Sequence, residues 1–492
     1  MATRAIPLDS RVNRSDSISR ALIVATLAIA VLATRIIWFG DPVADIDEQL
    51  YSLIGQQMLH GQMPYIDLWD RKPFGLFALF ALAHWLFGPG PVAYQTVAAA
   101  FTFVGALLTY SLARDLVDRF GATMAGVLYA ILMCAFASYS GQSEAFHVPM
   151  MLGAVWLVRD PNHRSASRRA LMAMLIAGFA LQIKYTVLPQ CALLGGWVLF
   201  SRWRRGCSWP ELMRTGALYA FIGLIPTLLV AVFYASIGGF DTLLQANITS
   251  AFERAAAPLG RLNPQTALWA NPITILVVFG LYAAFRVKRP DNMARYWFYA
   301  AWLLACVATV FLPSTVYLYY YATLVPAAVL LVTPLLDRRG PFGPFAGLVL
   351  VTLSFVLIQP ANRYRHSLFE RAENLHLAQA IAPHVSNTAC LWVYDGPTAL
   401  YRMTGSCLPT RFIYPDHLNN LLEHDALGTS QPGEVRRILS HKPPVIVAAS
   451  AAFTEQSPDV AAIVKRALAK DYRPIASANL HDRVVTAYLR HQ

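Results

Sequence analysis

The sequence contains few charged residues. Asp, Glu, Lys and Arg make up 14% of its 492 residues, whereas soluble domains carry about 25%. Hydrophobic residues reach 56%, and the mean hydropathy is +0.43. Soluble domains also stop growing a single core near roughly 250 to 300 residues. This composition excludes an ordinary soluble enzyme and predicts an integral membrane protein.

Several chemical signatures are also missing. The six cysteines make no disulfide framework and no CxxC pair, and the chain has no HExxH motif, Walker loop or GxGxxG after a strand. Zinc ribbons and thioredoxin-like sites are therefore not indicated. The formal charge is +12, but the basic residues lie between apolar runs. We therefore expect no nucleic-acid partner.

Eleven apolar runs are long enough to predict membrane-spanning helices. They lie near residues 21–39, 91–113, 121–139, 144–158, 169–186, 187–201, 214–237, 269–285, 295–312, 317–336 and 342–359. Charge, proline or glycine bounds each run. The basic arm 1–20 is too long and too poor in cleavage signals for a removed signal peptide, so we expect it to be cytoplasmic.

The run Pro73–Phe87 is short for a span and suits a helix in the membrane interface. If it does not cross, the outer side of the membrane part carries few basic residues, as the positive-inside rule requires. These are Arg71, Lys72, Lys184, Arg254 and Arg261. If it crossed, the bias would invert. We therefore place this run on the outer face.

Eleven crossings leave residues 360–492 outside the cytoplasm, as a small periplasmic α/β domain after the transmembrane domain 21–359. Predicted strands are Cys390–Tyr394, Arg411–Tyr414, Val445–Ala449 and Val484–Leu489, and predicted helices are 367–382 and 458–470. Cys390 and Cys407 are either a disulfide or two buried thiols. The other cysteines are expected to be packing residues.

Acidic residues concentrate in the first outer loop, residues 40–72, which we place within a catalytic outer region 40–90. They are Asp41, Asp45, Asp47, Glu48, Asp67 and Asp70. An amphipathic helix, Gln49–Leu59, is predicted to follow Asp47 and Glu48. Asp45 is placed to cap that helix, and acids in a first turn favour its dipole, so a structural role stays open for any single acid.

Three outward-facing cations call for an anionic partner. Arg71 and Lys72 end the first outer loop, and Lys184 lies at the outer end of an apolar span. A substrate phosphate would account for all of them. The alternatives are lipid headgroups for Arg71 and Lys72, and simple snorkelling for Lys184.

Other polar and aromatic residues face the same side. The second outer loop holds Glu144 and His147, which could reach the same cavity as Asp47. A helix cap and a structural histidine are the plainer interpretations of these two. The cluster that includes Tyr319 and Tyr320 is typical of an interfacial aromatic belt, although one or two members could bind substrate.

The first outer loop resembles that of the GT-C glycosyltransferases. An acidic pair is followed by Tyr51, Gly61, Pro64-Tyr65, Trp69-Asp70 and Lys72-Pro73. The bacterial branch related to protein O-mannosyltransferases and to the aminoarabinose transferases of lipid A is the most similar. The resemblance covers roughly residues 20–200 well and the remainder only in layout.

The family's motifs map onto single residues of this chain. Its Asp-Glu pair corresponds to Asp47 and Glu48, and its Lys-Pro-Pro motif to Lys72-Pro73, with Phe74 in place of the second proline. Its acid after the third span corresponds to Glu144, which is often Asp in relatives. Its lysine at the outer end of a later span corresponds to Lys184, here followed by Tyr instead of the Gly seen in some relatives.

The resemblance implies an inverting transfer of a sugar from a polyprenyl-phosphate carrier to a hydroxyl of a glycan, glycolipid or protein outside the cytoplasm, at the inner membrane. Asp47 would act as the base, with Glu48 beside it. Arg71, Lys72 and Lys184 would stabilise the leaving phosphate. The expected substrate-binding residues are Glu144, His147, Tyr319 and Tyr320.

Other functions remain open from the sequence. Asp45-Ile46-Asp47 matches the DxD motif of nucleotide-sugar transferases, but three residues are a weak signal and those donors are cytoplasmic. No metal site is predicted, although a divalent cation could bridge Asp47 and the lipid phosphate. A transporter or lipid flippase is the main alternative. The unusual charges gather at one face instead of at mid-membrane, which favours an enzyme over a transporter.

Overall fold

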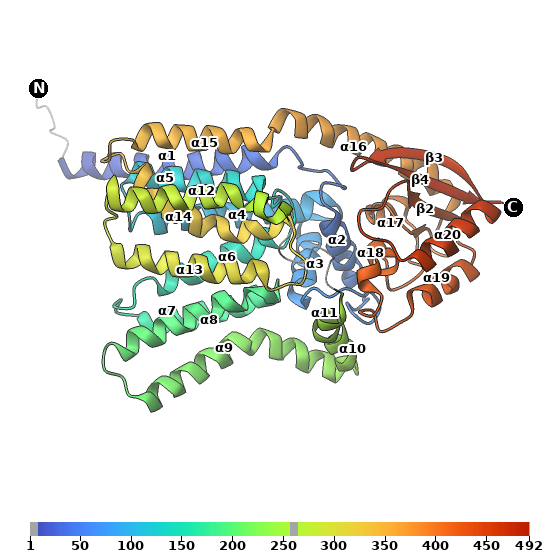
Figure 1. The fold of residues 1–492 in the computed structure, drawn as a ribbon, viewed down its shortest axis with the longest axis horizontal. Helices are drawn as coiled ribbons and strands as arrows, with labels where there is room; N and C mark the ends of the chain where they lie inside the picture. The colour runs from blue at the N-terminus through green and yellow to red at the C-terminus, as the bar shows by residue number, and fades with distance from the viewer. Residues whose placement is uncertain (1–7, 256–263, 492) are drawn as a thin grey trace, which may run out of the picture.

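The computed structural model describes residues 8–255 and 264–491. Within them, eleven helices run side by side as a bundle (Figure 1). These are α1 (Leu8–Arg35), α4 (Pro91–Ala113), α5 (Arg119–Ala135), α6 (Glu144–Val158), α7 (Ala166–Leu181), α8 (Leu188–Trp203), α9 (Trp209–Ser236), α12 (Pro264–Arg286), α13 (Met293–Phe311), α14 (Val325–Leu336) and α15 (Gly343–Ile358). Each coincides with a predicted run, so the predicted polytopic fold class is confirmed.

By length and composition, seven of the described helical segments are long and apolar enough to cross a membrane. The bundle helices α5, α6, α7 and α8 are shorter, at 15 to 17 residues. Helix α1 begins at Leu8 and so extends into the predicted N-terminal arm. Residues 1–7 of that arm, and Arg261, lie outside the described residues. The fold is that of a multi-pass membrane protein.

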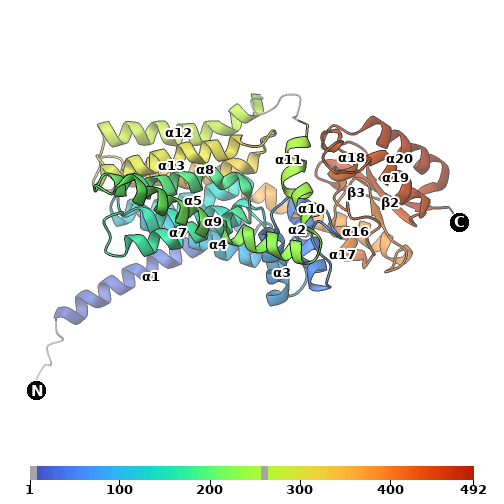
Figure 2. The same cartoon turned by 90° about the horizontal axis from the view of Figure 1, so that it is seen from below.

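Two short helices, α2 (Ile46–Leu59) and α3 (Phe74–Phe87), lie between the bundle and the C-terminal sheet (Figures 1 and 2). The small helices α10 (Phe240–Leu244) and α11 (Ser250–Glu253) lie in the same layer. Helix α3, with 14 residues, lies outside the bundle, next to α2 (Figure 1).

The ends of α2 follow from local sequence. Asp45 has extended backbone, and its side chain accepts a hydrogen bond from the amide of Asp47, which caps the helix N-terminus. The helix stops at His60, and Gly61 follows with φ +87°, a conformation that favours glycine. This cap fixes Asp47 in the first turn, at the end of α2 that carries the acids.

The C-terminal part is an α/β domain. Helix α16 (Pro360–Ile381) leads away from α15, and a four-stranded sheet follows in the order β1-β2-β4-β3. β1 (Trp392–Val393) pairs with β2 (Val445–Ala449) in parallel, whereas β4 (Arg483–Arg490) runs antiparallel to both β2 and β3 (Tyr472–Leu480). The helices of this part are α17 (Ala399–Thr404), α18 (Pro415–Asn419), α19 (Gln431–Ser440) and α20 (Pro458–Asp471). Cys390 and Cys407 form a disulfide, one of the two predicted alternatives.

The prediction of a strand at Arg411–Tyr414 is wrong. This segment is irregular, and the carbonyl of Arg411 accepts a hydrogen bond from the amide of Trp69, 2.9 Å away, instead of from a neighbouring strand. Phe412 and Ile413 are buried because they pack with the first outer loop. The sheet instead contains β3, which the sequence analysis missed. Pro474 lies at an irregularity of that strand, which obscures its pattern.

One hydrophobic core joins the C-terminal domain to α2 and α3. Leu50 of α2, Phe77 of α3, Ile413 and Val447 of β2 all belong to the same buried cluster. The C-terminal domain therefore packs directly on the loop that carries the acidic residues, and the irregular segment 411–414 lies close to the start of α2.

Candidate active site

Asp47 is at the centre of a cluster of polar side chains. Its Oδ2 accepts hydrogen bonds from the hydroxyls of Tyr51 at 3.2 Å and Tyr319 at 3.1 Å, and from the side-chain amide of Gln142 at 3.2 Å. Its Oδ1 accepts one from the hydroxyl of Tyr414 at 3.0 Å. The side chain is 20% exposed, so the carboxylate is both held and accessible.

Lys72 lies beside this carboxylate. Its Nζ is 3.9 Å from Oδ2 of Asp47 and 5.5 Å from the centroid of the Tyr51 ring. Burial opposes the charge of the ammonium, but Asp47 and the other acidic groups around it, Tyr320, Asp70 and Glu144, together outweigh burial, and the pKa of Lys72 is raised above its usual value. Its backbone amide is fixed by Oδ1 of Asp70 at 2.8 Å. Lys72 is therefore a positioned cation.

A close backbone contact brings Lys72 and Lys184 to the same site. The amide of Leu76 donates to the carbonyl of Gln182 at 3.0 Å, and a Cβ on Gly75 would lie only 2.6 Å from the Cβ of Gln182. The start of α3 can approach the end of α7 this closely because residue 75 is glycine. Lys72 precedes the contact in one segment, and Lys184 follows it in the other.

Lys184 is buried and forms an ion pair with Glu144. Its Nζ also lies 3.5 Å from the centroid of the Tyr320 ring and 5.7 Å from that of Tyr319. His147 is buried one helical turn from Glu144, with Nε2 3.9 Å from the carboxylate, and neither of its ring nitrogens has a hydrogen-bond partner among the described residues. The structure therefore brings Lys184, Glu144, His147, Tyr319 and Tyr320 together.

Glu48 points away from this cluster. Its carboxylate is fully buried and accepts hydrogen bonds from the hydroxyl of Tyr94 at 3.2 Å and from the backbone amide of Gly141. Burial raises the pKa of Glu48 to about 8. The sequence analysis placed it with Asp47 as a catalytic residue. In the structure its hydrogen bonds instead connect α2 to α4 and to the second outer loop.

Arg71 is also directed elsewhere. Its guanidinium forms a two-pronged ion pair with Glu423 of the C-terminal domain, and Nε of Arg254 lies 2.6 Å from the same carboxylate. Burial would raise the pKa of Glu423, but the two arginines lower it to about 2. The expected phosphate-binding role of Arg71 is therefore not what the structure shows. The ion pair of Arg71 with Glu423 connects the first outer loop to the C-terminal domain.

Sequence reasoning did not assign Gln142, Tyr51 or Tyr414 to the site. Gln142 donates to both Asp45 and Asp47, and it was seen only as part of a tight loop. Tyr51 follows Asp47 by four residues, so helical spacing could have indicated it. Tyr414 comes from a segment 367 residues away, and no local pattern predicts that contact.

The arrangement combines one accessible carboxylate with two lysines. Asp47 can accept a proton, because Oδ1 accepts only one hydrogen bond from the described residues and retains a lone pair. Lys72 and Lys184 can stabilise a nearby anion. The described residues contain no group of three or more His, Cys, Asp or Glu side chains arranged to hold a metal ion.

Part of the chain is similar in sequence to known proteins. The family model described as dolichyl-phosphate-mannose-protein mannosyltransferase matches residues 71–230. The dolichol phosphate-mannose mannosyltransferase of Haloferax volcanii is 28% identical over 150 residues. That match includes 29% of this chain and spans 33% of the relative's length.

Similar folds are found among solved structures. ArnT from Cupriavidus metallidurans, bound to undecaprenyl phosphate, aligns with a TM-score of 0.66 and 16% identity over 95% of this chain and 98% of that chain. The same protein in the apo state gives a TM-score of 0.61 and 15% identity with the same coverage. The chain therefore has the fold of the GT-C glycosyltransferases and resembles the protein O-mannosyltransferases and ArnT.

Proposed function

We propose that the protein is an inverting glycosyltransferase that takes a sugar from a polyprenyl-phosphate carrier and passes it to a hydroxyl acceptor. The family match and the fold of ArnT, which was solved with undecaprenyl phosphate bound, support this class of donor. The single observation that carries the proposal is the placement of Lys72 Nζ 3.9 Å from the Asp47 carboxylate. This contact places a base and a cation side by side at one accessible position.

Asp47 serves as the general base in this proposal. It takes the proton of the acceptor hydroxyl as the oxygen attacks the anomeric carbon, and the bond from that carbon to the carrier phosphate breaks. Such base catalysis contributes about a hundred- to ten-thousand-fold. Hydrogen bonds from Tyr51, Tyr319 and Tyr414 orient the carboxylate.

Lys72 and Lys184 serve the leaving group. The carrier phosphate gains negative charge as the glycosidic bond breaks, and cations in a partly buried site stabilise that charge more than they would in water. The ammonium of Lys184 has three N–H donors, so it can bind the phosphate while it remains paired with Glu144. The leaving phosphate is already anionic and needs no general acid.

The proposed acceptor is a glycolipid, polysaccharide or protein of the cell envelope, including lipopolysaccharide. We place the reaction at the periplasmic face of the inner membrane, with the N-terminus in the cytoplasm. In this arrangement the domain 360–492 is periplasmic and completes the site through Tyr414.

A transfer assay tests the proposal. Purified full-length protein is incubated with radiolabelled polyprenyl-phosphate sugars and extracted envelope glycolipids or proteins, and label is followed from carrier to acceptor. Transfer with inversion at the anomeric carbon is expected. If no common donor is consumed, while the same protein moves lipid-linked sugars across vesicle membranes, a flippase is the correct function.

A further inference from the structure

The backbone of Lys72 is held on both sides. Its amide donates to Oδ1 of Asp70 at 2.8 Å, and its carbonyl accepts a hydrogen bond from the hydroxyl of Tyr65, also at 2.8 Å. Pro73 follows in the sequence and restricts the backbone of Lys72 further. A lysine side chain is long and flexible, so a fixed backbone limits where its ammonium can lie. Asp70 and Tyr65 therefore help to keep the Lys72 ammonium beside Asp47.

The second oxygen of Asp70 faces a histidine of the C-terminal domain. Nε2 of His417 lies 3.4 Å from Oδ2 of Asp70, and both side chains are buried. Burial would raise the pKa of Asp70, but His417 and Lys72 outweigh it and lower that pKa below its ordinary value. A buried carboxylate needs polar partners. His417 faces one oxygen of Asp70, and the amide of Lys72 binds the other.

The ring of His417 is held in place by its surroundings. It packs edge-on against Trp69, with ring centroids 4.7 Å apart, and against Tyr414 at 5.3 Å. Its backbone carbonyl accepts a hydrogen bond from the side-chain amide of Gln431, a buried residue of α19, at 2.9 Å. Nδ1 of the ring has no hydrogen-bond partner among the described residues. The contact with Asp70 is therefore the polar interaction that orients the ring.

Tyr414 and His417 lie about one helical turn apart at the start of α18. The hydroxyl of Tyr414 donates to Asp47, and the ring of His417 faces Asp70. The backbone amide of His417 donates to the carbonyl of Tyr414 at 3.0 Å, which fixes the spacing of the two side chains. One short segment of the C-terminal domain thus contacts both the proposed base and the residue that holds the backbone of Lys72.

We infer that His417 is a positioning residue for the carrier phosphate. It orients Asp70, and Asp70 fixes the backbone of Lys72 so that the lysine ammonium meets the phosphate. The inference rests on one part of the proposed function, the binding of the carrier phosphate by Lys72. His417 itself touches neither the phosphate nor the sugar and transfers no proton. The C-terminal domain therefore acts on donor binding through His417 and on the base through Tyr414.

The test is a double-mutant cycle on the binding of radiolabelled undecaprenyl phosphate to the full-length protein, followed by scintillation proximity in detergent. His417→Phe keeps a ring between Trp69 and Tyr414 but removes Nε2, and it should weaken binding by at least about threefold. His417→Gln should restore most of the affinity, because its amide can donate to Asp70. In a Lys72→Ala protein, His417→Phe should cause no further loss.

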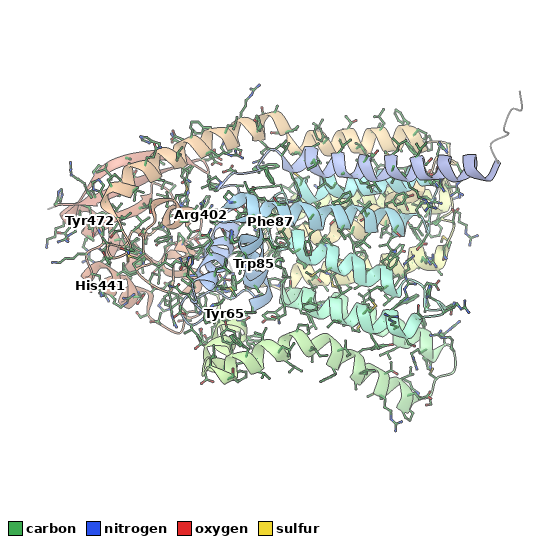
Figure 3. The ribbon with its side chains drawn as sticks, turned by 180° about the vertical axis from the view of Figure 1, so that it is seen from behind. Tyr65, Trp85, Phe87, Arg402, His441 and Tyr472 are labelled. Carbon is green, nitrogen blue, oxygen red and sulfur yellow. A yellow bond between two sulfur atoms is a disulfide. The ribbon has the colours of Figure 1, made fainter. Side chains whose placement is uncertain are left out.

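His441→Phe is the matched control. His441 is an exposed histidine just after α19 in the same domain, and Figure 3 shows it well away from Tyr65. Its replacement should leave binding unchanged. Melting temperatures without added lipid show whether each variant is folded. If His417→Phe does not fold, the smaller His417→Leu takes its place in the cycle.

Three results would overturn the inference. Wild-type affinity in the folded His417→Phe or His417→Leu protein would show that the histidine does not position the lysine. Losses that add fully to that of Lys72→Ala would show that His417 acts by another route. No binding of undecaprenyl phosphate to the wild type would contradict this inference and the proposed function together. Coupled losses in a protein that transfers no sugar would support the inference and contradict only the transferase reaction.

Discussion

The hydroxyl of Tyr414 lies 3.0 Å from Oδ1 of Asp47, although 367 residues separate them in the chain. The C-terminal domain thereby places a side chain directly on the proposed base. Phe412 and Ile413, buried beside Trp69, hold the segment that carries Tyr414 against the first outer loop. The domain is thus part of the proposed active site.

Tyr414→Phe tests this contact. Removing one hydrogen bond to a carboxylate costs about 1.5 to 3 kcal/mol, so turnover should fall by roughly tenfold or more while the KM for the donor changes little. Tyr394→Phe is the matched control, because the hydroxyl of Tyr394 bonds to Gln456 within the C-terminal domain. Wild-type turnover in Tyr414→Phe, or an equal loss in Tyr394→Phe, would show that the contact does not orient the base.

Lys72→Ala and Lys184→Ala test the phosphate site. Each should lower kcat/KM for the donor by at least about tenfold, the effect of a lost charge-assisted hydrogen bond. Lys184→Ala also leaves Glu144 buried and unpaired, which can cost about 3 to 5 kcal/mol of stability. The double variant with Glu144→Gln removes that complication. Lys288→Ala, at a partly exposed loop lysine that pairs with Asp291, is the control. Unchanged donor dependence in both single variants would contradict a phosphate role and leave snorkelling as the explanation for Lys184.

The sequence was sufficient to predict the eleven bundle helices, because each apolar run is bounded by charge, proline or glycine. It also indicated that Lys72, Lys184 and Tyr319 share a site with Asp47. It could not show that Arg71 is paired with Glu423, since that contact joins segments 352 residues apart. Arg411–Tyr414 has the composition of a strand, but packing against Trp69 removes its strand partner. Long-range packing decided both outcomes.

Glu48→Gln tests the structural role of Glu48 through pH. Burial raises the pKa of Glu48 to about 8, whereas an unfolded glutamate titrates near about 4.3. The folded state therefore holds a proton on Glu48 that the unfolded state releases at about pH 4.3. The stability that this protonated side chain contributes is fully present below about pH 4.3 and is lost as the pH rises through about 8. Glu48→Gln keeps the neutral shape, so its melting temperature should fall less between pH 6 and pH 9 than that of the wild type. Glu455→Gln, at an exposed position, should follow the wild type. Parallel curves for Glu48→Gln and the wild type would show that Glu48 is not protonated in the fold.

Eleven crossings make a prediction about topology. A reporter fused after Gln492 should be active only if it reaches the periplasm, because an odd number of spans separates it from a cytoplasmic N-terminus. A reporter in the loop between α5 and α6 should give the same result, since Gln142 and Tyr414 both contact Asp47. A reporter in the loop between α8 and α9 completes the test, because that loop is expected to lie in the cytoplasm. A cytoplasmic C-terminus would contradict the proposed orientation.

The proposed base is tested by Asp47→Asn, which keeps the shape of the side chain but removes its ability to take a proton. In asparagine one of the two carboxylate oxygens becomes an NH2 group, so one tyrosine hydroxyl still donates to the retained oxygen and the other can accept from the new amide, and the variant should fold. Donor binding should survive, because Asp47 acts on the acceptor hydroxyl, and turnover should fall by at least about a hundredfold.

Asp45→Asn is the matched control. Asp45 caps α2, and asparagine caps helices about equally well, so both stability and turnover should change little. If Asp45→Asn abolished turnover and Asp47→Asn did not, the base would be Asp45. If both variants kept wild-type turnover, proton transfer would not pass through this pair of carboxylates.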